Sequence, residues 1–423
     1  MKTKKLCGLI LGILFHVFQN TLAQTAFPLQ ASKDGQHLLD EQEQPFLMVA
    51  DVAWQLFRKL SLQEAAEYMD IRKSQSFNCI IVQALPGSPN LKNFYKQEAF
   101  KGGSFSQPNP GYFSHIEKVV AAAKKREIAV GIVVNRQGWH QSFVDASPES
   151  IGQYMSHLIQ TVGKHKNVFW LVDDTDQSRP YASLLTEQIR TLQPNRMMGL
   201  LLQQYPKISK EVNGGPYDLD FIIPDSTNSE TDYKNFVKKQ QASEETGEIQ
   251  RPFLLANSIF SKELLDQSAE IRQQAFTAFM ASGSGFCHQS TIKNFNPTWK
   301  TNITQDGAEY IEKLVKVLNG VPWAFLKTEW NSSLLVSPMD RAEVHVKMLT
   351  NKRMAIAYLP DSRSINVYLS HLEGDQFRAV WYSPRTGKRW FAGTLPNQPE
   401  ASLTPPENKS EWDWILLIGA GQN

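Results

Sequence analysis

Carboxylates, amides, a histidine and indole rings follow short apolar segments at many points of this sequence. Asp173, Asp174 and Asp176 come after the segment 168–172, and Asp225 comes after another. Carboxylate pairs transfer protons and attack as nucleophiles, and indole rings pack against the apolar faces of ligands. The other residues in equivalent places are Asp51, Trp54, Gln83, Asn135, Arg136, Trp139, Asn257 and His288. Such a polar set with aromatic neighbours is typical of a sugar site.

Each of these residues also has a structural interpretation. Asp51 could cap the helix that follows it, and Trp54 could pack beneath that helix. The acidic run 173–176 precedes a helix that begins near Pro180, where carboxylates cap helices and complement the helix dipole. His288 could be a hydrogen-bonded core histidine. The residue types alone leave both interpretations open.

Apolar segments alternate with amphipathic helical segments between residues 46 and 318, which positions these residues at strand ends. The apolar segments are 46–50, 79–85, 128–134, 168–172, 197–202, 221–224, 253–256 and 285–288. The helical segments are 62–73, 113–126, 151–165, 181–192, 233–241, 271–281 and 307–318. Eight strands with intervening helices predict an α/β fold, a (β/α)8 TIM barrel whose site lies at the carboxyl ends of the strands. An open doubly wound sheet is the alternative.

The pattern changes after Trp330. Residues 327–339 have no clear periodicity and are predicted to be a linker. Short β-segments follow, separated by turn residues such as Pro360-Asp361. We therefore predict a barrel over residues 24–335, with an N-terminal β-hairpin at 29–46, and a small antiparallel β-sandwich over 336–423.

Composition excludes several classes of protein. Lys and Arg number 44 against 42 Asp and Glu, so the net charge is +2 and no nucleic-acid surface is expected. No His and Cys cluster has zinc spacing and no glycine-rich phosphate loop occurs, so we expect neither a metal nor a cofactor. An oligo- or polysaccharide is the expected partner. The sequence does not predict the oligomeric state.

The first 23 residues have the pattern of a signal peptide. Lys2, Lys4 and Lys5 precede the apolar run 6–18, and small residues before Gln24 allow cleavage after Ala23. The run is too short to span a membrane, for which about 20 residues are needed. We therefore expect an exported protein, periplasmic or extracellular, whose two remaining cysteines, Cys79 and Cys287, are buried thiols.

Several stretches resemble the apiosidase-like glycoside hydrolases, which are family 140 and its relatives. They are 45–54 (Pro-Phe-Leu-Met-Val-Ala-Asp-Val-Ala-Trp), 60–68, 77–81, 109–113 and 167–170. The stretch 381–387 (Trp-Tyr-Ser-Pro-Arg-Thr-Gly) is similar to the small β-domain of these proteins, which carries an inherited collagen-binding label. The resemblance implies a glycosidase barrel in which Asp51 and Trp54 hold sugar hydroxyls and a sugar face.

Both catalytic positions of that family are changed in this sequence. The resemblance implies a retaining mechanism, with an acid/base Asp after the fourth strand and a nucleophilic Glu at the end of the seventh. Aligned without a gap, these positions hold Thr175 and Asn257. A shift of one residue would give the acid/base role to Asp174, and Asp176 is another candidate. The amide of Asn257 cannot attack as a carboxylate does.

Two hypotheses of function follow. The first is a working exported glycoside hydrolase with a rearranged carboxylate pair, in which Asp174 or Asp176 acts with Glu263 or Asp225. The second is a catalytically inactive relative that binds a glycan in the retained cleft. A pure adhesion module would rest on the C-terminal β-domain alone.

Overall fold

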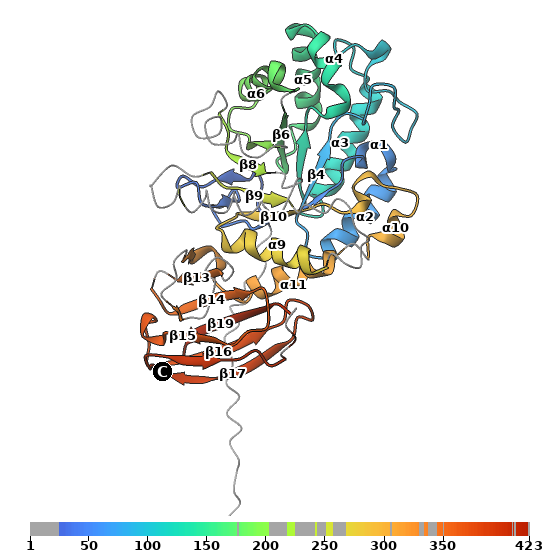
Figure 1. Cartoon of the computed structure of the whole chain (residues 1–423). Helices are drawn as coiled ribbons and strands as arrows, with labels where there is room; N and C mark the ends of the chain where they lie inside the picture. Colours follow the sequence, from blue (N-terminus) through green and yellow to red (C-terminus); the bar gives the residue numbers. More distant parts are fainter. Residues whose placement is uncertain are drawn as a thin grey trace, which may run out of the picture.

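The chain folds into a barrel and a β-domain, which lie against each other in the computed structural model (Figure 1). The structure describes residues 25–175, 177–202, 218–224, 242, 251–256, 268–304, 307–329, 334–336, 345–349, 351–407, 409 and 412–421. Among these residues, no helix is long and apolar enough to cross a membrane. The predicted signal peptide and the predicted helix 233–241 lie outside the described residues.

Parallel strands form the barrel, as the sequence predicted. The strands are β3 (Met48–Val52), β4 (Cys79–Gln83), β5 (Ala129–Val133), β6 (Val168–Asp174), β7 (Met198–Leu202), β8 (Phe221–Pro224), β9 (Leu254–Ala256) and β10 (Gly285–His288). They neighbour one another in the order β8-β7-β6-β5-β4-β3-β10-β9. A parallel bridge between Ile222 and Phe253 joins the two edge strands. The predicted TIM barrel is confirmed.

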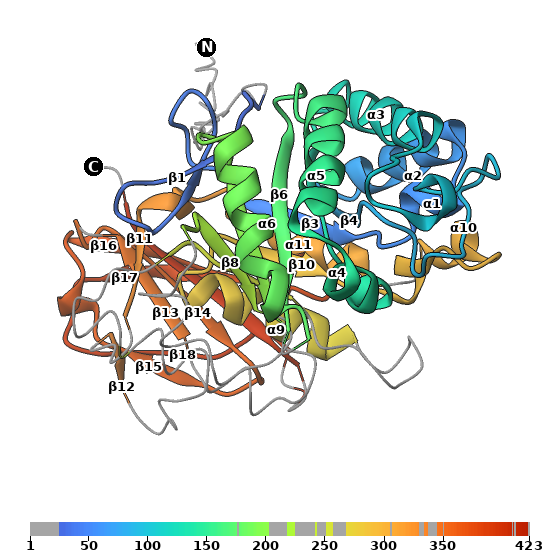
Figure 2. The ribbon, with the colours of Figure 1, turned by 90° about the horizontal axis from the view of Figure 1, so that it is seen from above.

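Helices cover the outside of the strands, and α2, α3, α5 and α6 follow one another around them (Figure 2). Ser61 and Glu64 form the predicted capping box at the start of α2. The helices are α1 (Leu56–Lys59), α2 (Leu62–Ser74), α3 (Pro110–Lys124), α4 (His140–Asp145), α5 (Pro148–Val162), α6 (Arg179–Leu192), α9 (Ser268–Met280), α10 (Trp299–Asn302) and α11 (Ala308–Leu318).

The barrel strands are buried on both faces, and alternate residues enter two separate hydrophobic clusters. One cluster lies inside the barrel and includes Met48, Ala50, Val52, Trp54, Cys79, Ile81, Ala129, Val133, Phe169, Leu171 and Leu201. The other lies between strands and helices and includes Val49, Ile80, Val82, Val130, Ile132, Trp170, Val172, Leu200 and Leu202. Membership of a cluster therefore tells which way a strand residue points.

Antiparallel strands form the β-domain, a sandwich of two sheets with its own buried cluster. The six-stranded sheet has the order β11-β13-β14-β19-β16-β17 and the three-stranded sheet β12-β15-β18. The strands are β11 (Leu326–Thr328), β12 (Leu335–Val336), β13 (His345–Leu349), β14 (Met354–Leu359), β15 (Ile365–Val367), β16 (Gln376–Tyr382), β17 (Arg389–Pro396), β18 (Ala401–Leu403) and β19 (Trp414–Ala420).

The linker predicted at 327–339 is wrong at its start. Leu326–Thr328 forms strand β11, which pairs antiparallel with β13, so the sheet takes in residues that precede the predicted boundary. Strand β11 has too few residues to show an alternating pattern, and its hydrogen bonds come from a strand distant in sequence. Two smaller predictions are confirmed: strands β1 (Gln30–Ala31) and β2 (Leu38–Leu39) form the N-terminal hairpin, and Cys79 and Cys287 are buried.

The long loop after β4 is held against the barrel by aromatic side chains. The rings of Phe100 and Phe105 pack edge to face with centroids 4.8 Å apart, and the Phe105 ring stacks on that of Tyr154. The indole nitrogen of Trp139 donates a hydrogen bond of 2.6 Å to the carbonyl oxygen of Pro86. These contacts fix the start of the loop beside the residues that follow β5.

The backbone at Gly138, after β5, also passes close to the backbone of the long loop at Gly87. A Cβ atom at this position would lie 1.7 Å from the carbonyl oxygen of Gly87. We expect Gly138→Ala to lower the free energy of unfolding by about 1–3 kcal/mol, because the two loops must move apart. Gly152→Ala is the control, since its Cβ would meet nothing closer than 3.7 Å inside α5. Urea denaturation measures both, and equal stability of the two variants would contradict the expectation.

Candidate functional site

The carboxyl ends of β3, β4 and β6 bring three side chains of the inner phase, which are those that point into the barrel, to its mouth. Trp54 belongs to the inner cluster, and Gln83 continues the inner phase of Cys79 and Ile81. Asp173 is the register partner of Leu201, another inner residue. Arg136 follows β5 and reaches two members of this set. We call Trp54, Gln83, Arg136 and Asp173 the mouth cluster.

Arg136 connects the indole and the carboxylate of the mouth cluster. Its guanidinium lies 4.2 Å from the centroid of the Trp54 ring, and its Nη1 lies 3.1 Å from Oδ2 of Asp173. The Asp173 side chain is fully buried, whereas the Arg136 side chain keeps 17% of its surface exposed. Arg136 is therefore the part of this charged pair that a ligand in the mouth can reach, and Trp54 supports it through a cation–π contact.

Asn135 fixes the backbone of Asp173 across the two strands. Its amide nitrogen donates a 2.9 Å hydrogen bond to the Asp173 carbonyl, and its amide oxygen accepts one of 2.9 Å from the Asp173 N–H. Asn135 also hydrogen-bonds the hydroxyl of Tyr181. Burial raises the pKa of Tyr181, the Asn135 hydrogen bond opposes this, and the nearby Asp173 charge adds to the increase. Asn135 and Tyr181 thus form a second row of polar residues behind the mouth cluster.

His140 completes this second row. Its Nδ1 forms a hydrogen bond with the hydroxyl of Tyr181. Burial and then the Arg136 charge lower the pKa of His140, which keeps the imidazole neutral near pH 7. A neutral imidazole beside a phenol can orient hydrogen bonds without adding charge to the site.

Gln83 has an unused hydrogen-bond donor. Its side chain is 5% exposed, and its Nε2 has no hydrogen-bond partner among the described residues. Buried amides without a partner are costly, and a ligand hydroxyl is one way to satisfy them. Gln83 is therefore a residue from the sequence analysis that the structure places in the mouth cluster, together with Trp54.

Asp51 points in the opposite direction, toward helix α2. Its Oδ2 lies 2.7 Å from Nε of Arg72 and accepts a hydrogen bond of 2.5 Å from the hydroxyl of Tyr68. Both ionic side chains are fully buried. Burial, followed by the Asp51 charge, raises the pKa of Tyr68 well above its usual value, so the phenol stays a donor. These contacts place Asp51 within a buried ion pair between strand and helix.

Asp174 and His288 also belong to the outer phase. Asp174 is the register partner of Leu202 and is 8% exposed. His288 is the register partner of Asp51, is fully buried, and its ring centroid lies 5.8 Å from that of Phe77. Neither residue joins the mouth cluster, and their predicted catalytic and binding roles remain predictions.

The other predicted site residues are buried in the core or lie outside the described part. Trp139 is 1% exposed and packs against Phe105 beneath the long loop, so its ring offers no open face. Thr175 is partly buried and shares hydrogen bonds with Ser178. The remaining predicted residues, which are Asp176, Asp225, Asn257 and Glu263, lie outside the described residues.

Asp173 and Arg136 stand at the mouth, although the sequence analysis named them only as residues at strand ends and assigned neither of them a catalytic or binding role. The structure, and not the sequence, identifies Asp173 as the inner carboxylate. A Cβ on Gly131 would lie 2.5 Å from the ring of Phe169, so these two positions face each other inside the barrel. Counting in steps of two from Phe169 leads to Leu171 and then to Asp173, which makes Asp173 and not Asp174 the inner carboxylate.

The described part of the chain holds no group of three or more His, Cys, Asp or Glu residues that could bind a metal ion. Two open grooves, of about 390 and 600 Å³, lie on the outer surface beside α5. Neither groove is lined by a member of the mouth cluster, so neither is a continuation of this site.

Comparisons with known proteins find family matches over most of the chain. Residues 32–324 match the family described as "Apiosidase-like, catalytic domain", and residues 331–419 match the "Putative collagen-binding domain of a collagenase". The first match covers more than half of the chain, and the chain therefore belongs to the apiosidase-like family. No curated protein sequence matches this chain.

Solved structures share this fold at low sequence identity. A protein described as a glycoside hydrolase is 16% identical with a TM-score of 0.79, over 94% of this chain and 98% of its own. A glycoside hydrolase family 5 protein from Bacteroides vulgatus is 17% identical with a TM-score of 0.79, over 94% and 95%. A β-L-arabinopyranosidase of family 27 from Geobacillus stearothermophilus is 9% identical with a TM-score of 0.52, over 90% and 97%. At these identities the likeness concerns the fold.

Proposed function

We propose that this chain is an exported protein that binds a glycan at the mouth of its barrel. The observation that carries the proposal is the mouth cluster, in which an indole, a guanidinium, a carboxylate and an amide converge from four neighbouring strand ends. Sugars present hydroxyl pairs that charged planar groups and amides bind, beside apolar faces that suit indoles. Membership of a family of glycoside-hydrolase-like barrels supports the same class of ligand.

Recognition is favoured over hydrolysis by the chemistry of the carboxylates. Retaining hydrolysis needs two carboxyl groups about 5–5.5 Å apart, one of which is protonated when the bond breaks. Asp173 is held in an ion pair with Arg136, which is an arrangement for binding and orientation. The sequence has Asn257 where the family's nucleophile is expected. Hydrolysis is the second candidate, favoured by the catalytic function of the family.

Glycan affinity tests the proposal. Purified mature protein is screened against plant and bacterial cell-wall oligosaccharides, and the best ligand is titrated against Arg136→Met and Gln83→Leu. Each variant is expected to lose about 10- to 100-fold in affinity, because one charge-assisted or otherwise unmet hydrogen bond disappears. Arg126→Met is the matched control, since Arg126 pairs with Asp70 on the barrel surface.

Three outcomes separate the candidates. Unchanged affinity in Arg136→Met and Gln83→Leu would place the ligand elsewhere, and absence of any glycan ligand would reject the proposal. Release of reducing sugar by the parent protein would favour hydrolysis. Arg126→Met is expected to bind as the parent does.

Export is part of the same proposal, and it is supported by the basic and apolar pattern of residues 1–23. Expression of the full chain in a secreting host is expected to give a mature N-terminus at Gln24 outside the cytoplasm. Intact-mass analysis of the fractions measures this, and an unprocessed cytoplasmic chain would contradict it.

A further inference from the structure

The β-domain shares a hydrophobic core with the barrel. Helices α9 and α11 lie between the barrel strands and the six-stranded sheet (Figure 1). The Phe276 ring of α9 stacks on the Tyr358 ring of β14, with centroids 5.2 Å apart and planes 7° from parallel. The buried cluster that contains these rings also includes Ile311, Leu314, Ile356, Tyr382 and Ile415. Domains joined by a continuous apolar core do not move freely relative to each other.

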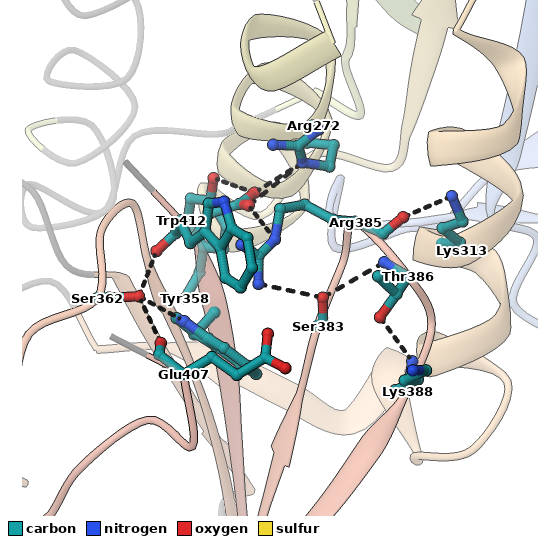
Figure 3. A network of polar contacts seen from close by, with 12 residues as sticks. Arg272, Lys313, Tyr358, Ser362, Ser383, Arg385, Thr386, Lys388, Glu407 and Trp412 are labelled. Atoms are coloured by element: carbon teal, nitrogen blue, oxygen red, sulfur yellow. Dashed lines mark hydrogen bonds and ion pairs between the residues drawn. The ribbon is translucent and has the colours of Figure 1, made fainter. Parts of the chain in front are cut away.

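A buried ion pair crosses this interface (Figure 3). Nε of Arg272 on α9 lies 3.1 Å from Oδ2 of Asp413, which immediately precedes β19. The two side chains are only 5% and 6% exposed. The hydroxyl of Tyr358 donates a 3.3 Å hydrogen bond to the same carboxylate, and Nε of Arg385 lies 3.8 Å from its other oxygen. Asp413 therefore joins one barrel helix to two parts of the β-domain.

The turn after β16 makes a second set of contacts with the barrel. The Tyr382 hydroxyl donates a 2.8 Å hydrogen bond to the backbone carbonyl of Lys313 on α11. In return, the Lys313 ammonium donates one of 2.7 Å to the Arg385 carbonyl (Figure 3). The turn itself is closed by a 2.7 Å hydrogen bond from the Gly387 N–H to the Ser383 carbonyl, and Gly387 has a φ of +74°. Side chains are disfavoured in this backbone conformation.

These contacts are made by residues of the stretch 381–387, whose sequence is similar to that of the β-domains with the collagen-binding label. Ser383 is fully buried, and the Arg385 side chain is 13% exposed, with its guanidinium 3.8 Å from the centroid of the Trp412 ring. A collagen helix needs an open surface along which it can lie. The turn 382–387 is already occupied by the barrel.

We propose that the turn 382–387 and Asp413 form a docking site for helices α9 and α11 of the same chain. The β-domain is then a required part of the barrel fold and not a separable collagen-binding module. Helix α9 connects β9 to β10, the strands that end at the predicted nucleophile position and at His288. Docking on α9 therefore also fixes the side of the barrel opposite the mouth cluster strands β5 and β6.

Thermal unfolding of the full mature chain tests the proposal. The parent is expected to unfold in one transition, because the two regions share one core. Asp413→Ala and Arg272→Met are each expected to lower the midpoint by about 4–6 °C or to split the transition, since each removes one partner of a buried ion pair. The double variant Arg272→Met/Asp413→Ala is expected to lose clearly less than the sum of the single losses.

Matched controls distinguish docking from a general effect of removing charges. Arg126→Met breaks a bidentate pair with Asp70 on the barrel surface and is expected to shift the midpoint by less than about 1 °C. Tyr382→Phe tests the same interface in case Asp413→Ala does not fold. It removes only the hydroxyl that donates to the Lys313 carbonyl, so this variant is expected to stay folded. Its expected loss is about 1–2 °C.

Two results would overturn the proposal. One is a parent chain with two independent transitions whose midpoints Asp413→Ala and Tyr382→Phe leave unchanged. The other is binding of the parent to fibrillar collagen that Arg385→Ala abolishes without a change in midpoint. Loss of stability in the interface variants, with no collagen binding in the parent, supports docking.

Discussion

The Asp51→Ala variant is expected to lose about 3–5 kcal/mol of its free energy of unfolding. Asp51 and Arg72 are both fully buried, and their Oδ2 and Nε atoms lie 2.7 Å apart. Alanine would remove the carboxylate that pairs with the buried guanidinium and that accepts the hydrogen bond of the Tyr68 hydroxyl. Because the pair joins strand β3 to helix α2, the loss affects the first β/α unit of the barrel. Denaturant unfolding monitored by tryptophan fluorescence measures it.

Asp70→Ala provides the control for Asp51→Ala. Asp70 also binds an arginine, Arg126, but its side chain is 61% exposed, and a loss below about 1 kcal/mol is expected. The comparison also tests the role in sugar binding that the sequence predicted for Asp51. A stable Asp51→Ala variant with much weaker glycan affinity would show that the carboxylate contacts the ligand, contrary to the buried ion pair.

The Asn257→Glu variant is expected to gain hydrolysis of activated aryl glycosides. A carboxylate at this position would attack the anomeric carbon and form a glycosyl ester, while the nitrophenolate leaves with the electron pair of the broken bond. Water then cleaves the ester and releases the sugar. A nitrophenolate needs no proton from a general acid, so Asp173 can remain paired with Arg136. The rate of nitrophenol release is expected to rise to at least about tenfold above that of the parent.

Asn257→Gln is the matched control, because glutamine has the same length as glutamate but no carboxylate. It is expected to release no nitrophenol above the parent. The substrates are aryl glycosides of the sugar found in the affinity screen. If Asn257→Glu melts at the parent midpoint and releases nothing from them, position 257 does not face the sugar and the alignment with the family is wrong.

The candidate site shows how far the sequence predicts chemistry. The strand ends are predicted within a few residues, which is enough to locate Gln83 and Trp54 near the mouth. The choice between Asp173 and Asp174 needs the direction of each side chain. In a strand that alternates polar and apolar residues this direction can be read from the sequence. Strand β6 is buried on both faces, so the pattern contains no such alternation.

The same reasoning explains Asp51, Trp139 and His288. All three follow apolar segments and look like rim residues in the sequence. Asp51 and His288 fall in the outer phase, where helix α2 covers Asp51 and the Phe77 ring packs against His288, and the long loop covers Trp139. A helix that returns over a strand, or a loop that folds back, is set by tertiary packing. Residue type and spacing do not record it.

The sequence by itself determined the order of strands and helices, the change to β-structure after the barrel and the burial of the two cysteines. These follow from local periodicity, turn residues and single residue identities, which act over a few residues of chain. The tertiary structure decided which carboxylate faces the barrel interior, which strand begins the second sheet, and that Asp413 binds a barrel helix. Those outcomes depend on contacts between residues far apart in sequence, whose energies no local pattern contains.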